Sequence, residues 1–159
     1  MSRMHERSLL LIPLAAWAAG LLGCGSNPAG PPAVPCTQST VFTSTIEVPP
    51  NTQLVQSFTT QSTGRIGVTV DWRLDINLMS VVLSQAPCSI SQLKASACNV
   101  LFSVFSPPKP LTSSTSLLRA GSYDLIIANL NSVPETATAV VTLTSAGCPT
   151  GAVSSTGTK

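Results

Sequence analysis

Short segments of alternating apolar and polar residues, punctuated by prolines and glycines, fill the chain from about residue 36 to residue 150. The clearest is RIGVTVDW, residues 65–72. In an extended strand its alternate apolar residues, from Ile66 to Trp72, share one face, while Arg65 and Asp71 lie on the other. A half-buried β-strand is therefore predicted here.

A second clear segment is SYDLIIAN, residues 122–129, which places Tyr123, Leu125 and Ile127 on one face. No stretch of this region has a helical period. Ala120 and Gly121 separate LLR from SYDLII and predict a tight hairpin. The same pattern predicts six further strands, at about residues 39–48, 53–60, 76–83, 98–105, 114–119 and 136–144. Eight short strands at this spacing predict an all-β domain, an antiparallel β-sandwich or jelly-roll-like fold over residues 36–150.

The N-terminus has the order of a secretory signal peptide. Arg3 and Arg7 precede an apolar run over residues 9–22, which contains Pro13. A transmembrane helix needs about 20 apolar residues, so this run is too short to span a bilayer comfortably. We expect residues 1–23 to be removed.

The end of this run, Leu21-Leu22-Gly23-Cys24, resembles the lipobox of bacterial lipoproteins. In that family the cysteine sulfur receives a diacylglyceryl thioether, and cleavage before the cysteine exposes an amine for acylation. The resemblance implies covalent acyl lipid on Cys24 and attachment to the membrane through it. The alternative is ordinary cleavage after Ala18 or Gly20, which would leave Cys24 as a free thiol.

Residues 24–35 continue as a Pro/Gly-rich stretch, which predicts an extended tether, and residues 151–159 predict a disordered tail. Gly25 follows the lipobox cysteine, where the inner-membrane retention signal best known in enterobacteria would be an aspartate. The expected location is therefore a bacterial cell envelope, at the outer membrane if the source is Gram-negative.

Composition narrows the function further. Only 9% of the chain is charged and the formal net charge is +2, so no cluster of basic residues is available to bind nucleic acid. The single histidine, His5, lies in the segment expected to be removed. Without it, Ser-His-Asp and Cys-His catalysis and histidine-ligated zinc are excluded. We expect no enzyme activity and no cofactor.

If Cys24 carries lipid, four cysteines remain in an exported protein, and disulfides are expected. Three connectivities can be drawn. A local bridge between Cys88 and Cys98 requires little chain travel, which leaves Cys36 and Cys148 to join the ends of the domain. The four cysteines lack the close pairing of a structural zinc site, so no metal is expected at them.

Two of the five remaining carboxylates, Asp71 and Asp75, are four residues apart on either side of Trp72 and Arg73. They could act as a catalytic carboxylate pair or as calcium ligands, with Trp72 as a ligand contact. The alternative is that the two aspartates face solvent beside Arg73. No glycine-rich ligand loop accompanies them, and this favours the second interpretation.

The segments TVDWRLDINLMSVVL and LLRAGSYDLIIANL resemble parts of the bacterial pre-peptidase C-terminal domain, a small β-sandwich. The matching residues of the first are Trp72, Asp75, Asn77 and Leu78; those of the second are Leu118, Ala120, Gly121 and Tyr123, and Phe58 in SFTT resembles an earlier strand of the family. The chain lacks the acidic cluster by which some members hold calcium. The resemblance implies non-catalytic binding to proteins, polymers or surfaces.

Together these features predict a lipid-anchored envelope protein that acts as a binding or structural module. The expected partners are another envelope protein or an extracellular polymer. Two alternatives remain: an accessory subunit of an envelope export or assembly complex, in which a sheet edge pairs with a partner strand, and a histidine-free hydrolase that uses Asp71 and Asp75.

Overall fold

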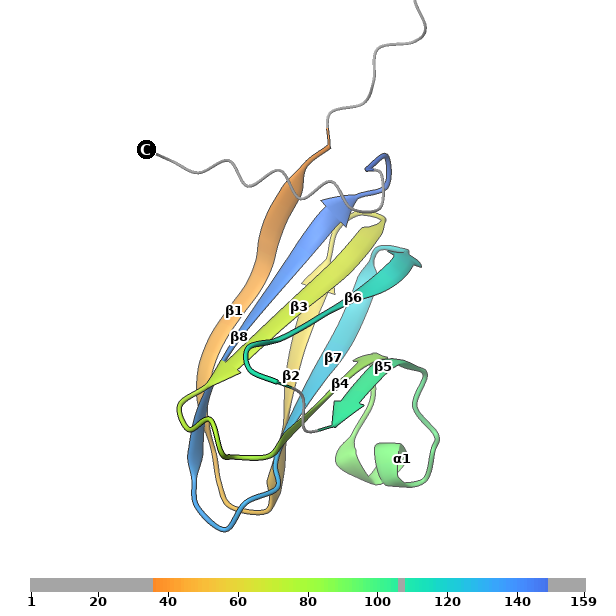
Figure 1. Cartoon of the computed structure of the whole chain (residues 1–159). Helices are drawn as coiled ribbons and strands as arrows, with labels where there is room; N and C mark the ends of the chain where they lie inside the picture. The colour runs from red at the N-terminus through yellow and green to blue at the C-terminus, as the bar shows by residue number, and fades with distance from the viewer. Residues whose placement is uncertain (1–35, 106–107, 149–159) are drawn as a thin grey trace, which may run out of the picture. The chain divides into compact units, whose positions relative to one another are not determined.

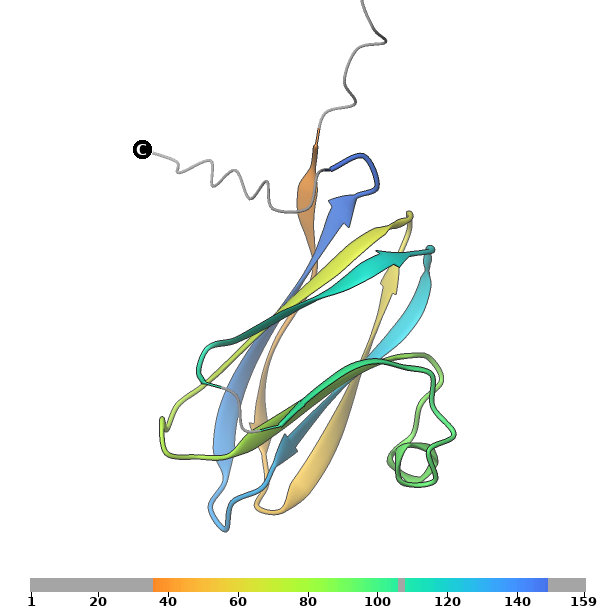
Figure 2. The same ribbon diagram turned by 45° about the vertical axis from the view of Figure 1, so that its right-hand side comes forward.

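The computed structural model describes residues 36–105 and 108–148. The predicted signal segment, the lipidation site Cys24, the tether and the tail lie outside these residues. Within them the chain forms two four-stranded antiparallel sheets, packed as the two layers visible in Figures 1 and 2. The predicted β-sandwich is confirmed. In spatial order the first sheet contains β1 (Gln38–Val48), β8 (Glu135–Ser145), β3 (Gly64–Trp72) and β6 (Leu111–Leu118), and the second contains β2 (Thr52–Thr60), β7 (Gly121–Asn129), β4 (Met79–Gln85) and β5 (Val100–Phe105).

Successive strands alternate between the two sheets at every connection except that from β4 to β5. Two four-stranded antiparallel sheets connected in this way form a jelly roll. The alternation seen in the sequence of β3 is reproduced: from Ile66 to Trp72 the apolar side chains are buried between the sheets, and Asp71 is exposed.

The predicted tight hairpin at Ala120 and Gly121 is wrong. β6 pairs with β3 in the first sheet, whereas β7 pairs with β2 and β4 in the second, so the chain crosses between layers at this point. Gly121 lies opposite Thr60 of β2, and the hydroxyl of Tyr123 donates to the carbonyl oxygen of Arg119. This bond from a buried tyrosine to the upstream backbone fixes a corner between the sheets.

A short helix, α1 (Ile90–Lys94), occupies the segment between Cys88 and Cys98 that the strand pattern left without structure. Ser89 and Gln92 explain it, because each side chain accepts a hydrogen bond from the backbone N–H of the other. This reciprocal capping box satisfies N–H groups that the first turn leaves unpaired. The S-x-x-Q signature was present in the sequence, and the helix could have been predicted from it.

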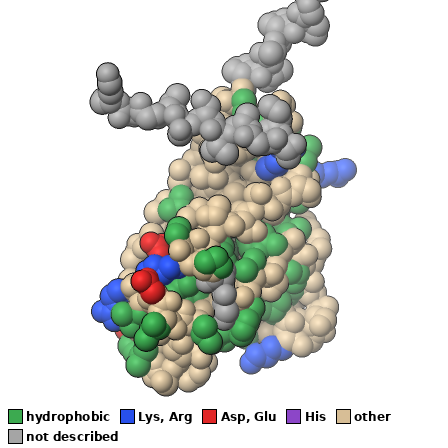
Figure 3. Space-filling model, in the orientation of Figure 1, with side chains coloured by type: hydrophobic (Ala, Val, Ile, Leu, Met, Phe, Trp, Pro, Cys, Tyr) green, Lys and Arg blue, Asp and Glu red, His purple; other side chains and the backbone are tan. Residues whose placement is uncertain are grey.

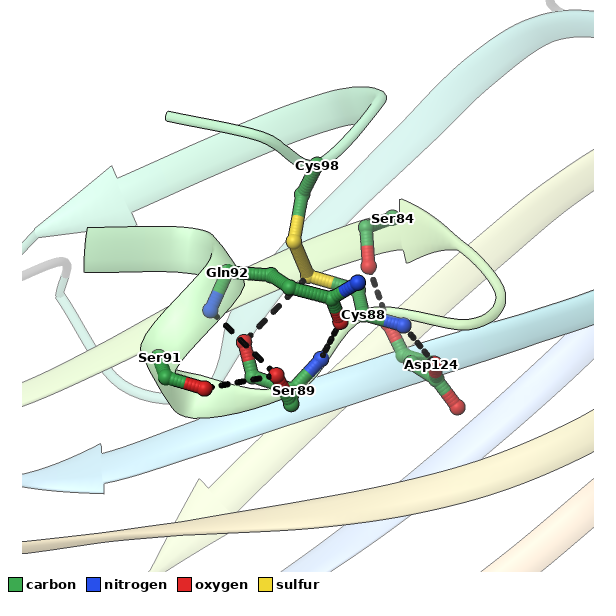
Figure 4. Close-up of a disulfide and its surroundings, with 7 residues drawn as sticks. All are labelled: Ser84, Cys88, Ser89, Ser91, Gln92, Cys98 and Asp124. Carbon is green, nitrogen blue, oxygen red and sulfur yellow. Dashed lines mark hydrogen bonds between the residues drawn. A yellow bond between two sulfur atoms is a disulfide. The ribbon is translucent and has the colours of Figure 1, made fainter. Parts of the chain in front are cut away.

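The domain contains two disulfides, Cys36–Cys148 and Cys88–Cys98, which are the pairs that the sequence favoured. Figure 4 shows the second of them beside α1, with Asp124 of β7 below. The buried Asp124 carboxylate accepts from the backbone N–H of Cys88 at 2.7 Å and from the hydroxyl of Ser57 at 2.6 Å. The first contact attaches the segment that contains α1 to β7, and the second joins β7 to β2.

The second sheet is therefore covered on both faces in its middle. Leu125 and Ile127 of β7 face the main core between the sheets, whereas Ile126 packs with Val82 and Cys88 in a smaller cluster under α1. This burial on both sides explains why β7 contains an uninterrupted apolar run rather than strict alternation.

Candidate functional site

The predicted site residues lie at the end of the sandwich opposite the Cys36–Cys148 disulfide. Four connections meet there: those between β1 and β2, β3 and β4, β5 and β6, and β7 and β8 (Figure 1). We call their described residues, 49–51, 73–78, 108–110 and 130–134, the loop end.

Lys109 occupies the space between the two candidate aspartates. Its ammonium nitrogen lies 2.8 Å from Oδ1 of Asp75 and 3.7 Å from Oδ1 of Asp71, and it also donates to the carbonyl oxygens of Trp72 and Arg73. The hydrogen bond with Asp75 raises the pKa of Lys109 above its usual value. The amine therefore stays protonated, and the two carboxylates and two carbonyls surround this ammonium group.

This arrangement argues against the calcium-ligand interpretation of Asp71 and Asp75. Calcium takes 6–8 oxygen ligands, and the Lys109 ammonium already lies among the oxygens that the two aspartates could contribute. In the part of the chain that the structure describes, no group of three or more His, Cys, Asp or Glu side chains could hold a metal ion. The structural interpretation of the pair is favoured.

Glu135, which was not predicted as a site residue from the sequence, organises the β3–β4 connection. Its carboxylate is buried and accepts from four donors. These are the backbone N–H groups of Arg73 at 3.0 Å, Leu74 at 3.2 Å and Thr136 at 2.9 Å, and the side-chain amide of Asn77 at 2.5 Å. A buried carboxylate needs such partners, because an unpaired one would be strongly destabilising. Glu135 thus holds the loop in one conformation.

The sequence did contain a signal for this residue. The strand predicted at 136–144 turns Ala137 and Ala139 inward, and the same two-residue period places Glu135 on the inward face. A glutamate at a core-facing position, directly after Pro134, could have been identified as a buried hydrogen-bond acceptor. Lys109 gave a weaker signal, since a lysine between prolines indicates only a loop.

Two asparagines hold the other connections in place. The buried Asn129 side chain donates to the carbonyl oxygens of Val48 at 3.0 Å and Val133 at 2.7 Å. The Asn131 side-chain oxygen accepts from the N–H of Leu78 at 3.0 Å, and its side-chain amide donates to the carbonyl oxygen of Leu78 at 2.9 Å. The end of β7 and the β7–β8 connection are thereby bonded to the last residue of β1 and to the segment that precedes β4.

Trp72 belongs to the core, with 4% of its surface exposed, and its indole N–H has no hydrogen-bond partner among the described residues. It is therefore not an exposed ring on which a ligand could stack. A depression of about 590 Å³ borders it and is widely open to solvent; the lining residues are Asp71, Trp72, Arg73, Lys109, Thr136 and Thr138.

Apolar side chains project into solvent from these hydrogen-bonded loops. The exposed fraction is 87% for Ile76, 48% for Leu78, 36% for Leu130 and 45% for Val133. Leu78 and Leu130 are adjacent, since the N–H of Leu130 donates to the carbonyl oxygen of Leu78 at 3.1 Å. On the face drawn in Figure 3, hydrophobic atoms adjoin Lys/Arg and Asp/Glu atoms near the β3–β4 connection. The loop end thus combines a rigid backbone with an exposed apolar surface.

Comparisons with known proteins give little beyond this geometry. No protein-family model matches the chain, and no curated protein matches it. Among solved structures, the chain is similar to that described as "Crystal structure of PirA", with 12% identity, a TM-score of 0.36, and coverage of 67% of this chain and 96% of that chain. So distant a likeness carries no argument about function. Among the described residues, no helix has the length and apolar character needed to cross a membrane.

Proposed function

We propose that this protein is a lipid-anchored, non-catalytic binding module of a bacterial cell envelope, and that its loop end binds another envelope protein. The anchor is inferred from the lipobox-like sequence ending at Cys24. The observation that carries the binding role is the rigid apolar display at the loop end, formed by Ile76, Leu78, Leu130 and Val133.

The polarity of this surface favours a protein partner over a hydroxyl-rich polymer. Burial of apolar side chains stabilises association by roughly 25 cal/mol per Å², and a polymer of hydroxyl groups offers little apolar surface in return. Arg73 and Asp75, both exposed, border the apolar residues. An apolar centre with a polar rim is the usual composition of a protein interface.

The hydrogen bonds of the loop end favour binding for a second reason. Because Glu135, Asn129 and Asn131 already hold the backbone in place, little further conformational entropy would be lost when a partner docks. A catalytic role for Asp71 and Asp75 gains no support, because both carboxylates are engaged by the Lys109 ammonium.

The anchor is tested by metabolic labelling of cells with a palmitate analogue. We expect label on the wild-type chain and none on Cys24→Ala. Equal labelling of the two chains would overturn the lipid attachment.

The binding surface is tested by placing a photo-crosslinking amino acid at Ile76 of the full chain and irradiating intact cells. A matched control is Leu117, an apolar residue of β6 that is 51% exposed and lies near the opposite end of the sandwich. We expect a discrete protein adduct from position 76 alone. Adducts of polysaccharide, or identical adducts from both positions, would contradict the proposal.

A further inference from the structure

The edge strand β5 differs from the other three edges of the sandwich. β1, β2 and β6 are each rich in serine, threonine and glutamine, whereas β5 has the sequence VLFSVF, in which five of six residues are apolar. Among the described residues β5 pairs only with β4, so its outer row of backbone N–H and C=O groups has no strand beside it. Figure 2 shows β5 at the near edge of its sheet.

Soluble proteins usually protect such an edge with charges, prolines or bulges, since an uncharged apolar edge readily pairs with another strand. β5 contains no charged residue and no proline. Its pairing with β4 is regular from Phe102 to Phe105, and the irregularity in the ladder lies outside that stretch, next to Val100. Phe105 is 69% exposed. A regular, uncharged backbone edge is therefore available.

We propose that β5 pairs with β5 of a second copy of this chain, in an antiparallel arrangement about a two-fold axis through Ser103. A two-fold axis perpendicular to a sheet places opposite one another residues whose numbers differ by an even count, because opposed side chains lie on the same face. With Ser103 on the axis, Phe102 lies opposite Val104 within the regular stretch, and Phe105 lies beside the irregularity at Leu101 of the other copy. The second sheets of the two copies, each of four strands, thereby join into one sheet of eight strands.

The identity of the opposed residues supports this register over its neighbour. Phe102 and Val104 face the core of their own sandwich beside Leu83 and Val81, so their pairing would extend that core across the interface. Leu101 packs against the same core at the irregularity of the ladder, and the exposed Phe105 of one copy would lie beside this part of the other copy's edge. An axis through Phe102 would instead place Val104 opposite Val100, on the far side of the irregularity in the ladder.

A second copy also suits the charge of this strand. Pairing of identical strands places every charge of the strand twice along the shared edge, and like charges placed opposite one another are destabilising. β5 has none. The inference does not depend on lipid attachment or on the binding role of the loop end.

A cysteine crosslink tests the register. Opposed residues of an antiparallel pair have Cα atoms about 4.5 to 5.5 Å apart, which lies within the range of a disulfide. In cells that produce the full chain, we expect Ser103→Cys to give a covalent dimer on non-reducing electrophoresis. The matched control is Ser114→Cys, an exposed serine on the edge strand β6, which we expect to remain monomeric. Equal crosslinking of the two variants would overturn the proposal.

Sedimentation equilibrium tests the association itself. The purified chain with Cys24→Ser, to which no lipid can be attached, is expected to form a dimer. Phe105→Lys should raise the dimer dissociation constant by about tenfold or more, because each copy then places a charged lysine on the shared apolar edge. Leu117→Lys should leave the dissociation constant unchanged. Phe105 is largely exposed, so its variant should fold, as its melting temperature would verify. The inference would be overturned if the Cys24→Ser chain with its β5 unchanged remained monomeric. It would also be overturned if β5 formed a complex only with a different protein.

Discussion

The ammonium nitrogen of Lys109 lies 2.8 Å from Oδ1 of Asp75, and this contact connects the β5–β6 connection to the β3–β4 connection. The nearby Asp71 carboxylate and two backbone carbonyls face the same ammonium group. A lysine thus stands where the two aspartates alone would have indicated a metal ion.

Calcium should consequently have no effect on the folded domain. At about 1 mM, the weak end of the range for extracellular calcium modules, we expect calcium and a chelator to give the same melting temperature by circular dichroism. Lys109→Ala should lower the melting temperature, because the carbonyl oxygens of Trp72 and Arg73 lose their donor. Lys94→Ala, an exposed lysine of α1, is the control and should change it little. A calcium-dependent rise in the wild type would contradict this account of the site.

Glu135→Gln should destabilise the domain strongly although it changes few atoms. An amide nitrogen would replace one of the two oxygens and would face hydrogen-bond donors. Removal of the acceptor for buried donors costs about 1–3 kcal/mol, so we expect a loss in this range from urea unfolding followed by Trp72 fluorescence. Glu47→Gln is the control on the exposed face of β1, and it should stay within about 0.5 kcal/mol of the wild type. Similar losses in both variants would show that Glu135 has no special role.

The strand pattern was sufficient to predict the sandwich, because alternation of apolar and polar residues reports directly which face of a strand is buried. It could not predict which strands pair. Ala120-Gly121 has the sequence of a tight turn, yet the crossing between sheets depends on the pairing of Gly121 and Tyr123 with residues of β2, about 60 positions earlier in the sequence. Short-range pattern carries no information about such partners.

The candidate site, too, could be predicted only in part from the sequence. Asp71 and Asp75 were identified from their spacing, but the group that engages them, Lys109, is 34 residues beyond Asp75. Only the fold brings that lysine to the end of β3. Glu135, by contrast, lay within reach of the sequence, since its inward register was visible from the neighbouring alanines.

The two disulfides should contribute unequally to stability. Cys36 and Cys148 are separated by 112 residues and Cys88 and Cys98 by 10. In the chain-entropy model, closure of a loop of about 100 residues stabilises by about 4.7 kcal/mol, and closure of one of 15 residues by about 3 kcal/mol. We expect the double variant Cys36→Ser, Cys148→Ser to lose more unfolding free energy in urea than Cys88→Ser, Cys98→Ser.

The burial of Cys88 acts against this order of stability losses, and an alanine control distinguishes the two effects. Cys88 is buried in the cluster under α1, so a serine there would also place a hydroxyl in an apolar site. Cys88→Ala, Cys98→Ala avoids the buried hydroxyl. If the alanine pair still loses more stability than the Cys36 and Cys148 variant, packing around α1 outweighs the chain-entropy difference.

Tyr123 should make the domain sensitive to alkaline pH. Burial raises the pKa of its phenol above the usual value of 10.0, so the folded state disfavours the phenolate relative to the unfolded state. The stabilisation is fully present below pH 10.0 and is lost as pH rises through the folded pKa. Lys109, whose pKa is also raised, acts in the same direction above its usual value of 10.5.

Tyr123 is the only tyrosine of the chain, so the ultraviolet absorbance of its phenolate follows this one group. We expect a titration midpoint above 10.0 in the folded protein and a return to about 10 in denaturant. Tyr123→Phe should cost about 1 kcal/mol at neutral pH through the lost bond to Arg119, and should lose less stability than the wild type between neutral pH and pH values above the usual pKa. An unshifted midpoint in the folded protein would contradict the buried, hydrogen-bonded corner.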